Sequence, residues 1–338
     1  MESPIWNVER MFTGPMKKYW RSRYRLFSRY DEGIILTKEL WFSVTPEDIA
    51  MFIAKFISTA FKGNCHSILD LFCGGGGNTI QFLRYFERVY GLDSNPMHLQ
   101  CSLNNANVYF DEEIIRDHLN LIECEWGGAD TGEADEASGL VNRSGSNDFE
   151  VGGQIRNDGD IHDGDEEDSD EEDSDEENSN EEDSGKEDSD KENSESSSED
   201  SDISTSSSSV SDSSSTSSSA DNYTKTVDYL KEQHIDVIFA SPPWGGPSYL
   251  KSEKYDLNRL LPLDLGSLLR SLRVISDRIV LFLPRNSDLE QIQAISEEVF
   301  GDCKVRVLRL STSGFTKGLI CCWGEEFEGV DLEEMKLS

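Results

Sequence analysis

A long acidic, serine-rich stretch divides the chain and limits what the chain can fold into. Between Gly127 and Asn222, 33 residues are acidic and 4 are basic, so this stretch holds most of the formal net charge of −36. It has no apolar periodicity and cannot bury enough apolar surface to offset the entropy of ordering. We therefore expect residues 127–222 to be a disordered acidic insertion, with a folded core built from the chain on either side.

Several protein classes are excluded by the remaining sequence. The seven cysteines form no Cys-x-x-Cys pair, so we expect neither a disulfide framework nor a metal site. No apolar run approaches the roughly 18–20 residues that span a bilayer, and Met1 to Arg10 lack the apolar stretch of a secretory signal. We expect a protein of the cytosol or nucleus with reduced thiols.

Apolar strands alternate with helical stretches on both sides of the insertion. Strands are expected at 67–72, 88–92 and 119–124 before the insertion, and at 235–240, 278–283, 303–310 and 317–323 after it. This alternation predicts an α/β, Rossmann-like fold with a seven-stranded, mostly parallel sheet, helices on both faces and a C-terminal antiparallel hairpin. A long insertion between the third and fourth strands is tolerable if its ends stay close together.

The same patterns divide the chain into six segments. These are a loosely ordered N-terminus (1–16), a basic-aromatic arm with a helical extension (17–62), the first part of the core (63–126), the insertion (127–222), the second part of the core (223–325) and a tail (326–338). The arm interleaves six basic with five aromatic residues between Lys17 and Tyr30, as expected either of a solvated amphipathic helix or of a segment that follows an RNA backbone. Thr45-Pro46-Glu47 predicts a helix start with Thr45 as the N-cap.

The first motif that indicates chemistry is Asp70-Leu71-Phe72-Cys73 followed by four glycines and Asn78. A glycine-rich turn between a strand and a helix lets a ligand approach the backbone, and the helix N-terminus favours an anionic group. Asp93 follows about 20 residues later, where a carboxylate can accept hydrogen bonds from ribose hydroxyls. A nucleotide-containing cofactor is predicted, and a dinucleotide enzyme fits these two features as well.

The second motif is Ser241-Pro242-Pro243-Trp244, directly after a buried strand. Two prolines stiffen the turn, and the carboxyl edge of an open α/β sheet is where ligands bind. A side-chain oxygen and the Pro242 carbonyl can accept protons from a planar exocyclic amine, while Trp244 can stack on a base. This arrangement indicates transfer of a methyl group to an amino group of a nucleobase.

Together these motifs resemble the class I S-adenosylmethionine-dependent methyltransferases, and more narrowly the trimethylguanosine synthase family of RNA cap guanosine-N2 methyltransferases. The resemblance covers nearly all of the folded part, including Lys18-Tyr19-Trp20, Trp41 to Glu47, Asn104-Asn105-Ala106 and Phe282 to Asn286. It implies S-adenosylmethionine as cofactor and two successive methyl transfers to N2 of a 7-methylguanosine cap. The product would be 2,2,7-trimethylguanosine on small nuclear and small nucleolar RNAs.

The resemblance also implies roles for matching residues. The cofactor-binding residues would be Thr45, Asp70, Cys73, Gly74, Asp93 and Glu125. The catalytic residues would be Ser241 and Pro242, which hold the amine, and Trp244, which stacks on the 7-methylguanine. The cap-binding residues would be Lys18, Phe27, Asn105, Trp244, Phe282, Arg285 and Asn286. Among these, Lys18 and Arg285 would bind the phosphates, Asn105 would help to hold the amine, and Phe27 and Phe282 would line the pocket.

Two alternatives remain open at this stage. One is a methyltransferase that acts on adenine N6 or on a tRNA guanine N2, and the other is a non-catalytic RNA-binding assembly factor with a methyltransferase fold. For the leading interpretation, the partners implied by the resemblance are capped small nuclear and small nucleolar RNA and the proteins of their ribonucleoprotein particles. It also implies a monomer with no membrane association, located in the nucleus, in the nucleolus or nuclear bodies, and in the cytoplasm.

Overall fold

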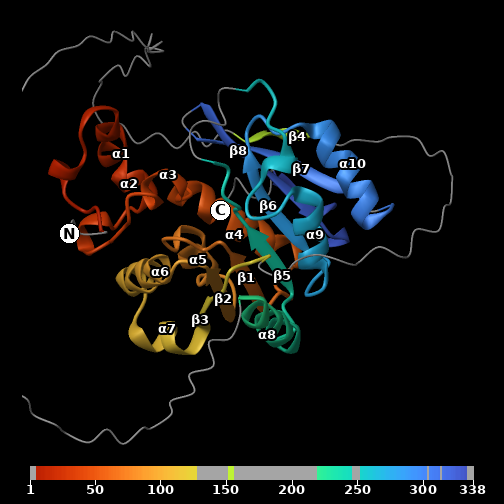
Figure 1. Ribbon diagram of the computed structural model, residues 1–338, viewed down its shortest axis with the longest axis horizontal. Coiled ribbons are helices and arrows are strands. Elements are labelled where there is room, and N and C mark those ends of the chain that lie inside the picture. The colour runs from red at the N-terminus through yellow and green to blue at the C-terminus, as the bar shows by residue number, and fades with distance from the viewer. Residues whose placement is uncertain are drawn as a thin grey trace, which may run out of the picture. The chain divides into compact units, whose positions relative to one another are not determined.

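The computed structural model describes residues 5–127, 151–155, 219–245, 252–302, 304–312 and 314–332. The strands are β1 (Ser67–Leu71), β2 (Arg88–Asp93), β3 (Leu119–Glu123), β4 (Val151–Ile155), β5 (Val237–Ala240), β6 (Ile279–Pro284), β7 (Val305–Thr312) and β8 (Phe315–Trp323). They form one sheet in the order β3-β2-β1-β5-β6-β8-β7-β4 (Figure 1). All seven expected strands are present, which confirms the predicted fold class, and β4 is an additional strand that we did not expect.

The directions of the central strands bring the loops that follow them to one edge of the sheet. β1 pairs in parallel with β2 and β5, β2 with β3, and β5 with β6. β8 runs antiparallel to both β6 and β7, so the predicted hairpin is confirmed, with its second strand lying between β6 and β7. Because β1, β2, β5 and β6 are parallel, the loops that follow them meet at the same edge.

Alternate residues of the central strands enter two apolar cores, one on each face of the sheet. On β1, Ile68 enters one core and Leu69 the other. Helices α4 (Glu47–Ala60), α5 (Gly77–Phe82), α6 (Pro96–Tyr109) and α7 (Glu112–His118) contribute to the first core, and helices α8 (Ser219–Glu232), α9 (Leu265–Arg273) and α10 (Leu289–Phe300) to the second. Each Leu, Ile or Phe that is fully buried in this way stabilises the fold by about 1.5–3 kcal/mol. No helix within these described ranges is long and apolar enough to cross a membrane.

Helix α4 begins where the sequence predicts a helix start, but without the predicted cap. Ile49, Ile53 and Ile57 are buried at helical spacing, and acidic residues in the first turn favour the positive helix N-terminus. The N-cap residue is Pro46, and no side chain caps the helix. The assignment of Thr45 as the N-cap was therefore wrong, because its hydroxyl instead accepts a hydrogen bond from Asn78 at 3.0 Å.

The N-terminal segment packs into an aromatic cluster on the arm, which contains α1 (Lys17–Arg21), α2 (Arg23–Leu26) and α3 (Leu40–Ser43). Phe12 is 1% exposed, and its ring centroid lies 5.6 Å from that of Trp6 and 4.7 Å from that of Trp41. The Trp41 indole also donates to the Trp6 carbonyl at 2.8 Å. The expectation of a loose N-terminus is wrong for residues 5–16, because aromatic residues with no regular spacing meet only in the folded arm.

The C-terminal tail is also part of the fold. Phe327 is fully buried, and the Arg306 guanidinium donates to the carbonyls of Phe327 and Val330. The predicted boundary at residue 325 is therefore too early, because this packing continues beyond β8 into the residues that we assigned to a tail.

The two ends of the insertion meet at the sheet. The Ser219 hydroxyl donates to the Glu125 carboxylate at 3.1 Å, and the Asn222 amide donates to the Glu123 carbonyl at 3.3 Å. β4 pairs in parallel with β7, and α8 already begins at Ser219. Most of residues 127–222 lies outside the described residues, so their disorder remains a prediction, but β4 and the start of α8 show ordered structure within that range.

A single carboxylate joins the chain across this insertion. Asp236 Oδ2 accepts hydrogen bonds from the backbone N–H groups of His66 and Ser67, at 2.8 and 3.0 Å, and from the Ser67 hydroxyl at 3.1 Å. The Asp236 N–H donates in turn to the Ser67 hydroxyl at 3.0 Å. The starts of β1 and β5, which pair in the sheet, are thereby fixed to each other.

Replacing residues 128–218 with a short Gly-Ser linker should leave the fold intact. The ends are already close, and shortening a loop changes its closure entropy by only about 0.6 kcal/mol per halving. We expect cooperative unfolding with a midpoint temperature within a few degrees of that of the full chain, measured by circular dichroism. A parallel replacement of 156–218 keeps β4, and loss of cooperative unfolding in both proteins would contradict the prediction.

Candidate active site

The predicted site residues follow strands that are neighbours in the sheet. Leu71 at the end of β1 is paired with Leu92 of β2 and with Ala240 of β5, and Ala240 is paired with Leu281 of β6. The glycine loop, Asp93, the Ser-Pro-Pro-Trp motif and the segment after β6 therefore emerge at the same edge. The structure thus brings both sequence motifs together.

The loop after β1 makes a sharp turn that is held by β2. Phe72, Gly74 and Gly76 have positive φ angles of 67°, 52° and 81°. The backbone N–H groups of Phe72 and Cys73 both donate to the Leu92 carbonyl, at 2.9 and 3.0 Å. The Cys73 side chain is buried, and burial raises the pKa of its thiol well above the usual range. Cys73 is thus a neutral thiol that packs in this turn rather than a nucleophile.

Asp70 is a buried carboxylate beneath this loop. Burial raises the pKa of Asp70 to about 7, although the Thr79 hydroxyl donates a hydrogen bond to its Oδ2. Its Oδ1 is buried and has no hydrogen-bond partner among the described residues. Asn78 Oδ1 is a second buried acceptor in the same situation. Such acceptors are costly unless a donor reaches them.

These two acceptors fit the ammonium group of S-adenosylmethionine. A cationic donor beside Asp70 would favour the ionised carboxylate and offset its desolvation. Thr45 belongs to the same group of side chains, because its hydroxyl is bonded to the Asn78 amide. When bound, S-adenosylmethionine supplies an electrophilic methyl group on its sulfonium. Asp70, Asn78 and the loop would hold the amino-acid end of this cofactor.

The glycines also allow the arm to pack on the loop. A Cβ atom at Gly75 would lie 2.9 Å from Leu36, and one at Gly77 would lie 3.0 Å from Val44. Both distances are shorter than a normal carbon–carbon contact of about 3.5–4.0 Å. We expected the glycines to make room for a ligand, and these two instead make room for the side chains of the arm.

Asp93 lies at the end of β2, and a backbone N–H group donates a hydrogen bond to each of its carboxylate oxygens. Its Oδ2 accepts from the Gly74 N–H at 3.0 Å, and its Oδ1 accepts from the Asn95 N–H at 2.9 Å. The carboxylate is thereby oriented beside the loop, as a ribose-binding acid requires. Glu125, predicted to lie near the adenine, follows β3, is exposed and accepts a hydrogen bond from Ser219.

Asn105 on α6 is a fully bonded bridge. Its Nδ2 donates to the carbonyls of Gly75 and Ile35, at 2.9 and 3.0 Å, and its Oδ1 accepts from the Ile35 N–H and the Asn104 amide, at 2.8 and 3.2 Å. Every hydrogen-bonding position of an Asn side chain is then in use. In this structure Asn105 connects the arm to the glycine loop, and it has no free group for the amine that we expected it to help hold.

The Ser-Pro-Pro-Trp motif forms the other side of the site. Ser241 is half-buried and Pro242 is buried at the end of β5. The Trp244 ring lies 5.3 Å from the Phe282 ring, centroid to centroid, at an angle of 59°. Trp244 packs against both apolar cores while remaining partly exposed, so an aromatic face is present beside the strand that carries Ser241.

The predicted phosphate-binding and pocket residues occupy different surroundings. Lys18 and Arg285 are both exposed, and Arg285 makes a long contact of 3.5 Å with the Thr316 carbonyl. Asn286 donates to the Ser252 carbonyl at 2.8 Å. Phe27 is only 2% exposed within the apolar core, so it offers little surface to a ligand. Phe282, which contacts Trp244, is the better placed of the two phenylalanines.

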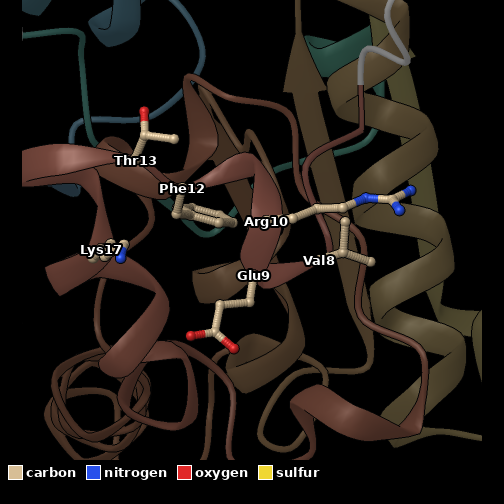
Figure 2. A pocket seen from close by; sticks show the side chains of 6 residues that line it. All are labelled: Val8, Glu9, Arg10, Phe12, Thr13 and Lys17. Carbon is tan, nitrogen blue, oxygen red and sulfur yellow. The ribbon is translucent and has the colours of Figure 1, made fainter.

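An open hollow of about 720 Å³ lies on the N-terminal segment and the start of the arm. It is lined by Val8, Glu9, Arg10, Phe12, Thr13 and Lys17 (Figure 2). The charged side chains of Glu9, Arg10 and Lys17 point in different directions, so the hollow does not resemble a site with converging polar groups. None of the predicted site residues lines it.

Sequence reasoning missed three polar residues that the structure brings to the site. Asn78 and Thr79 bond to Thr45 and Asp70, and His98 lies 3.3 Å from Asp93. The first two directly follow the glycine run, and this position was an available signal. His98 had none, because its neighbours come from the arm and from β2.

Comparisons with known proteins show what this chain is similar to. Residues 65–326 match the family described as RNA cap guanine-N2 methyltransferase. A trimethylguanosine synthase of Saccharomyces cerevisiae is 31% identical over 317 residues, which cover 93% of this chain and 69% of the relative. A trimethylguanosine synthase of Schizosaccharomyces pombe is 26% identical, over 91% of this chain and 85% of the relative. A solved putative methyltransferase of Porphyromonas gingivalis aligns with 92% of this chain and 49% of its own, with 10% identity and a TM-score of 0.48.

The family match extends over more than half of the chain and includes the glycine loop, Asp93 and the Ser-Pro-Pro-Trp motif. The buried acceptors beside the loop fit S-adenosylmethionine, and the aromatic pair is formed by Trp244, which follows the neighbouring strand β5, and Phe282 in β6. The chain belongs to the RNA cap guanine-N2 methyltransferase family and is an S-adenosylmethionine-dependent enzyme that acts on capped RNA.

Proposed function

We propose that the protein transfers two methyl groups in succession to N2 of a 7-methylguanosine cap, which produces 2,2,7-trimethylguanosine. The observation that supports this best is the Trp244–Phe282 pair next to Ser241 and Pro242. The two relatives described as trimethylguanosine synthases support the same product. The RNAs proposed as substrates are small nuclear and small nucleolar RNAs.

The aromatic side of the site explains a preference for a methylated guanine. Methylation at N7 makes the guanine ring cationic, and a cation over a Trp face gains about 0.5–2 kcal/mol, with the higher values where water is excluded. Trp244 is partly buried by both cores, which favours the upper part of this range. Unmethylated guanine would stack on the same ring without this electrostatic gain.

The polar side of the site orients the amine rather than activating it. The Ser241 hydroxyl and the Pro242 carbonyl can each accept a hydrogen bond from an N–H of the exocyclic amine. The methyl donor is already reactive, so alignment of the two reactants can supply most of the rate. A neutral serine also places no formal charge beside the amine. Lys18 and Arg285 would bind the cap phosphates, where a guanidinium suits two-pronged contact.

Methyl transfer to small cap analogues tests this function. With S-adenosylmethionine and excess protein, we expect transfer to 7-methyl-GDP, about 2- to 30-fold less to GDP as the cation–π energy implies, and weaker use of 7-methylguanosine, which lacks phosphates. Mass spectrometry should show one and then two methyl groups on N2. Transfer to neither nucleotide, with the cofactor still bound, would instead indicate an internal base as substrate, and absence of cofactor binding would indicate an assembly factor.

Partners and location belong to the same proposal. We expect a monomer that meets proteins of small nuclear and small nucleolar ribonucleoprotein particles. The family substrate supports a location in the nucleus, in the nucleolus or nuclear bodies, and also in the cytoplasm. Light scattering of the purified chain and fluorescence imaging of a tagged chain would test the two parts separately.

A further inference from the structure

A histidine lies between the acid at the end of β2 and the N-terminal arm. His98, in the first turn of α6, has its Nδ1 3.3 Å from Asp93 Oδ1. Its Nε2 lies 3.5 Å from Glu39 Oε2 and 3.4 Å from Thr37 Oγ1. The imidazole is 16% exposed. One ring therefore spans the core sheet, through Asp93, and the arm, through residues 37–39.

We propose that His98 is a positioning residue whose protonated ring clamps the arm to Asp93 and thereby strengthens cofactor binding. The proposal rests on the cofactor assignment and not on the identity of the RNA. The clamped segment leads directly into α3, whose Leu40 would meet a Cβ at Gly74 at 3.1 Å. The same Gly74 donates its N–H to Asp93 Oδ2. Arm, loop and acid thus form a closed chain of contacts that passes through His98.

The electrostatic surroundings favour the protonated ring. Burial acts to lower the pKa of His98, but hydrogen bonds and charge interactions with Asp93 and Glu39 outweigh it and raise the pKa above its usual value. Like burial, the positive end of the α6 dipole acts against a positive charge on His98. Among the residues that the structure describes, the ionisable groups in contact with the ring are Asp93 from β2 and Glu39 from the arm.

Loss of the proton breaks the clamp on one side. A neutral imidazole has one N–H and one acceptor nitrogen. If Nδ1–H stays on Asp93, Nε2 can accept from the Thr37 hydroxyl, but it then faces the Glu39 carboxylate with a lone pair. Because the folded-state pKa is raised, the clamp is complete below the ordinary histidine value of about 6.5 and is lost as the pH rises through the higher folded value.

Calorimetric titration with S-adenosylmethionine between pH 6 and 8.5 tests the clamp, with wild type, His98→Asn and Glu39→Gln compared. The Asn amide can take the place of Nδ1 on Asp93 but cannot reach the arm. We expect wild type to bind about three- to tenfold more tightly than His98→Asn at pH 6, as for loss of one ordinary hydrogen bond. This ratio should fall towards one as the pH rises through the raised pKa of His98. Taking the ratio at each pH cancels the titration of the cofactor's own amino group and of Asp70.

Glu39→Gln is the control that keeps the test decisive if His98→Asn folds poorly. Glu39 is 76% exposed, so its amide variant should fold normally and bind the cofactor with a weaker pH dependence than wild type. Turnover of 7-methyl-GDP at saturating cofactor should keep its kcat in both variants, with the change confined to the cofactor KM. A ratio of wild-type to variant cofactor affinity that stays constant with pH would overturn the proposal. So would a fall in kcat by the same factor by which the cofactor KM rises. Binding is measured without RNA, so a failed cap assay leaves this result independent.

Discussion

Trp244→Ala is expected to abolish the preference for 7-methyl-GDP over GDP and to lower kcat/KM for 7-methyl-GDP by at least about tenfold. Stacking of a base on an aromatic ring contributes about 1–3 kcal/mol, and the positive charge of 7-methylguanine adds a cation–π contribution of about 0.5–2 kcal/mol. The variant loses both contributions for the methylated base and only the first for GDP. Radiolabelled methyl transfer to the two nucleotides, with initial rates at several concentrations, measures the change.

Two comparisons separate recognition from folding. Trp244→Phe keeps a stacking face and should retain part of the preference. Phe315→Ala removes a phenylalanine that is 56% exposed on β8 and should leave both rates unchanged. Cofactor affinity should be unaltered in Trp244→Ala. An unchanged ratio between 7-methyl-GDP and GDP in that variant would show that the cation is recognised elsewhere.

Asp70→Asn is expected to weaken S-adenosylmethionine binding about 10- to 100-fold. A hydrogen bond to a charged group contributes about 1.5–3 kcal/mol, and the amide cannot compensate the ammonium of the cofactor. Calorimetry at pH 7.5 measures the loss. Asp117→Asn, on the exposed surface of α7 where it pairs with Arg116, is the matched control and should bind like wild type. Equal affinities for Asp70→Asn and wild type would exclude Asp70 from the cofactor site.

The same variant should change how stability depends on pH. The pKa of Asp70 is raised from its ordinary value to about 7, so the folded state holds a proton that the unfolded state has already released. Stability of the cofactor-free protein should therefore fall as the pH rises from about 4 to 7, and Asp70→Asn should remove this component. Thermal unfolding at pH 5 and 7.5 compares the two proteins. S-adenosylmethionine should raise the thermal stability of the wild-type protein most strongly at the higher pH, where the Asp70 carboxylate is ionised.

The sheet was predictable because its signals are local. Each central strand is a short, continuous apolar run, and β1 and β5 each lead directly into a motif that contains Gly or Pro. Position in an open parallel sheet then brings those motifs together without knowledge of side-chain contacts. The juxtaposition of the glycine loop with the Ser-Pro-Pro-Trp turn follows from this topology.

The missed features depend on contacts between distant residues. Thr45 has the pattern of an N-cap, yet its hydroxyl bonds to Asn78 on α5. Asn105 matches a binding motif, but three hydrogen bonds to the arm and the loop and a fourth from Asn104 use its amide. β4 pairs with β7 across about 150 residues of sequence, and a five-residue segment that contains two glycines gives no strand signal of its own. Partners of this kind are chosen by the fold and not by local sequence.

The hydrogen bonds between Asp236 and the start of β1 have a consequence for synthesis of the chain on the ribosome. β1 ends at Leu71, and its partner β5 begins only at Val237, with the acidic insertion translated between them. At about 5–20 residues per second, β1 is exposed along that edge for roughly 8–30 s before β5 and Asp236 are made. Unpaired strand edges promote association between nascent chains, and strong negative charge on the following segment opposes it. We therefore expect the negative charge of the acidic insertion to oppose association of nascent chains during the interval in which the half-finished sheet is exposed.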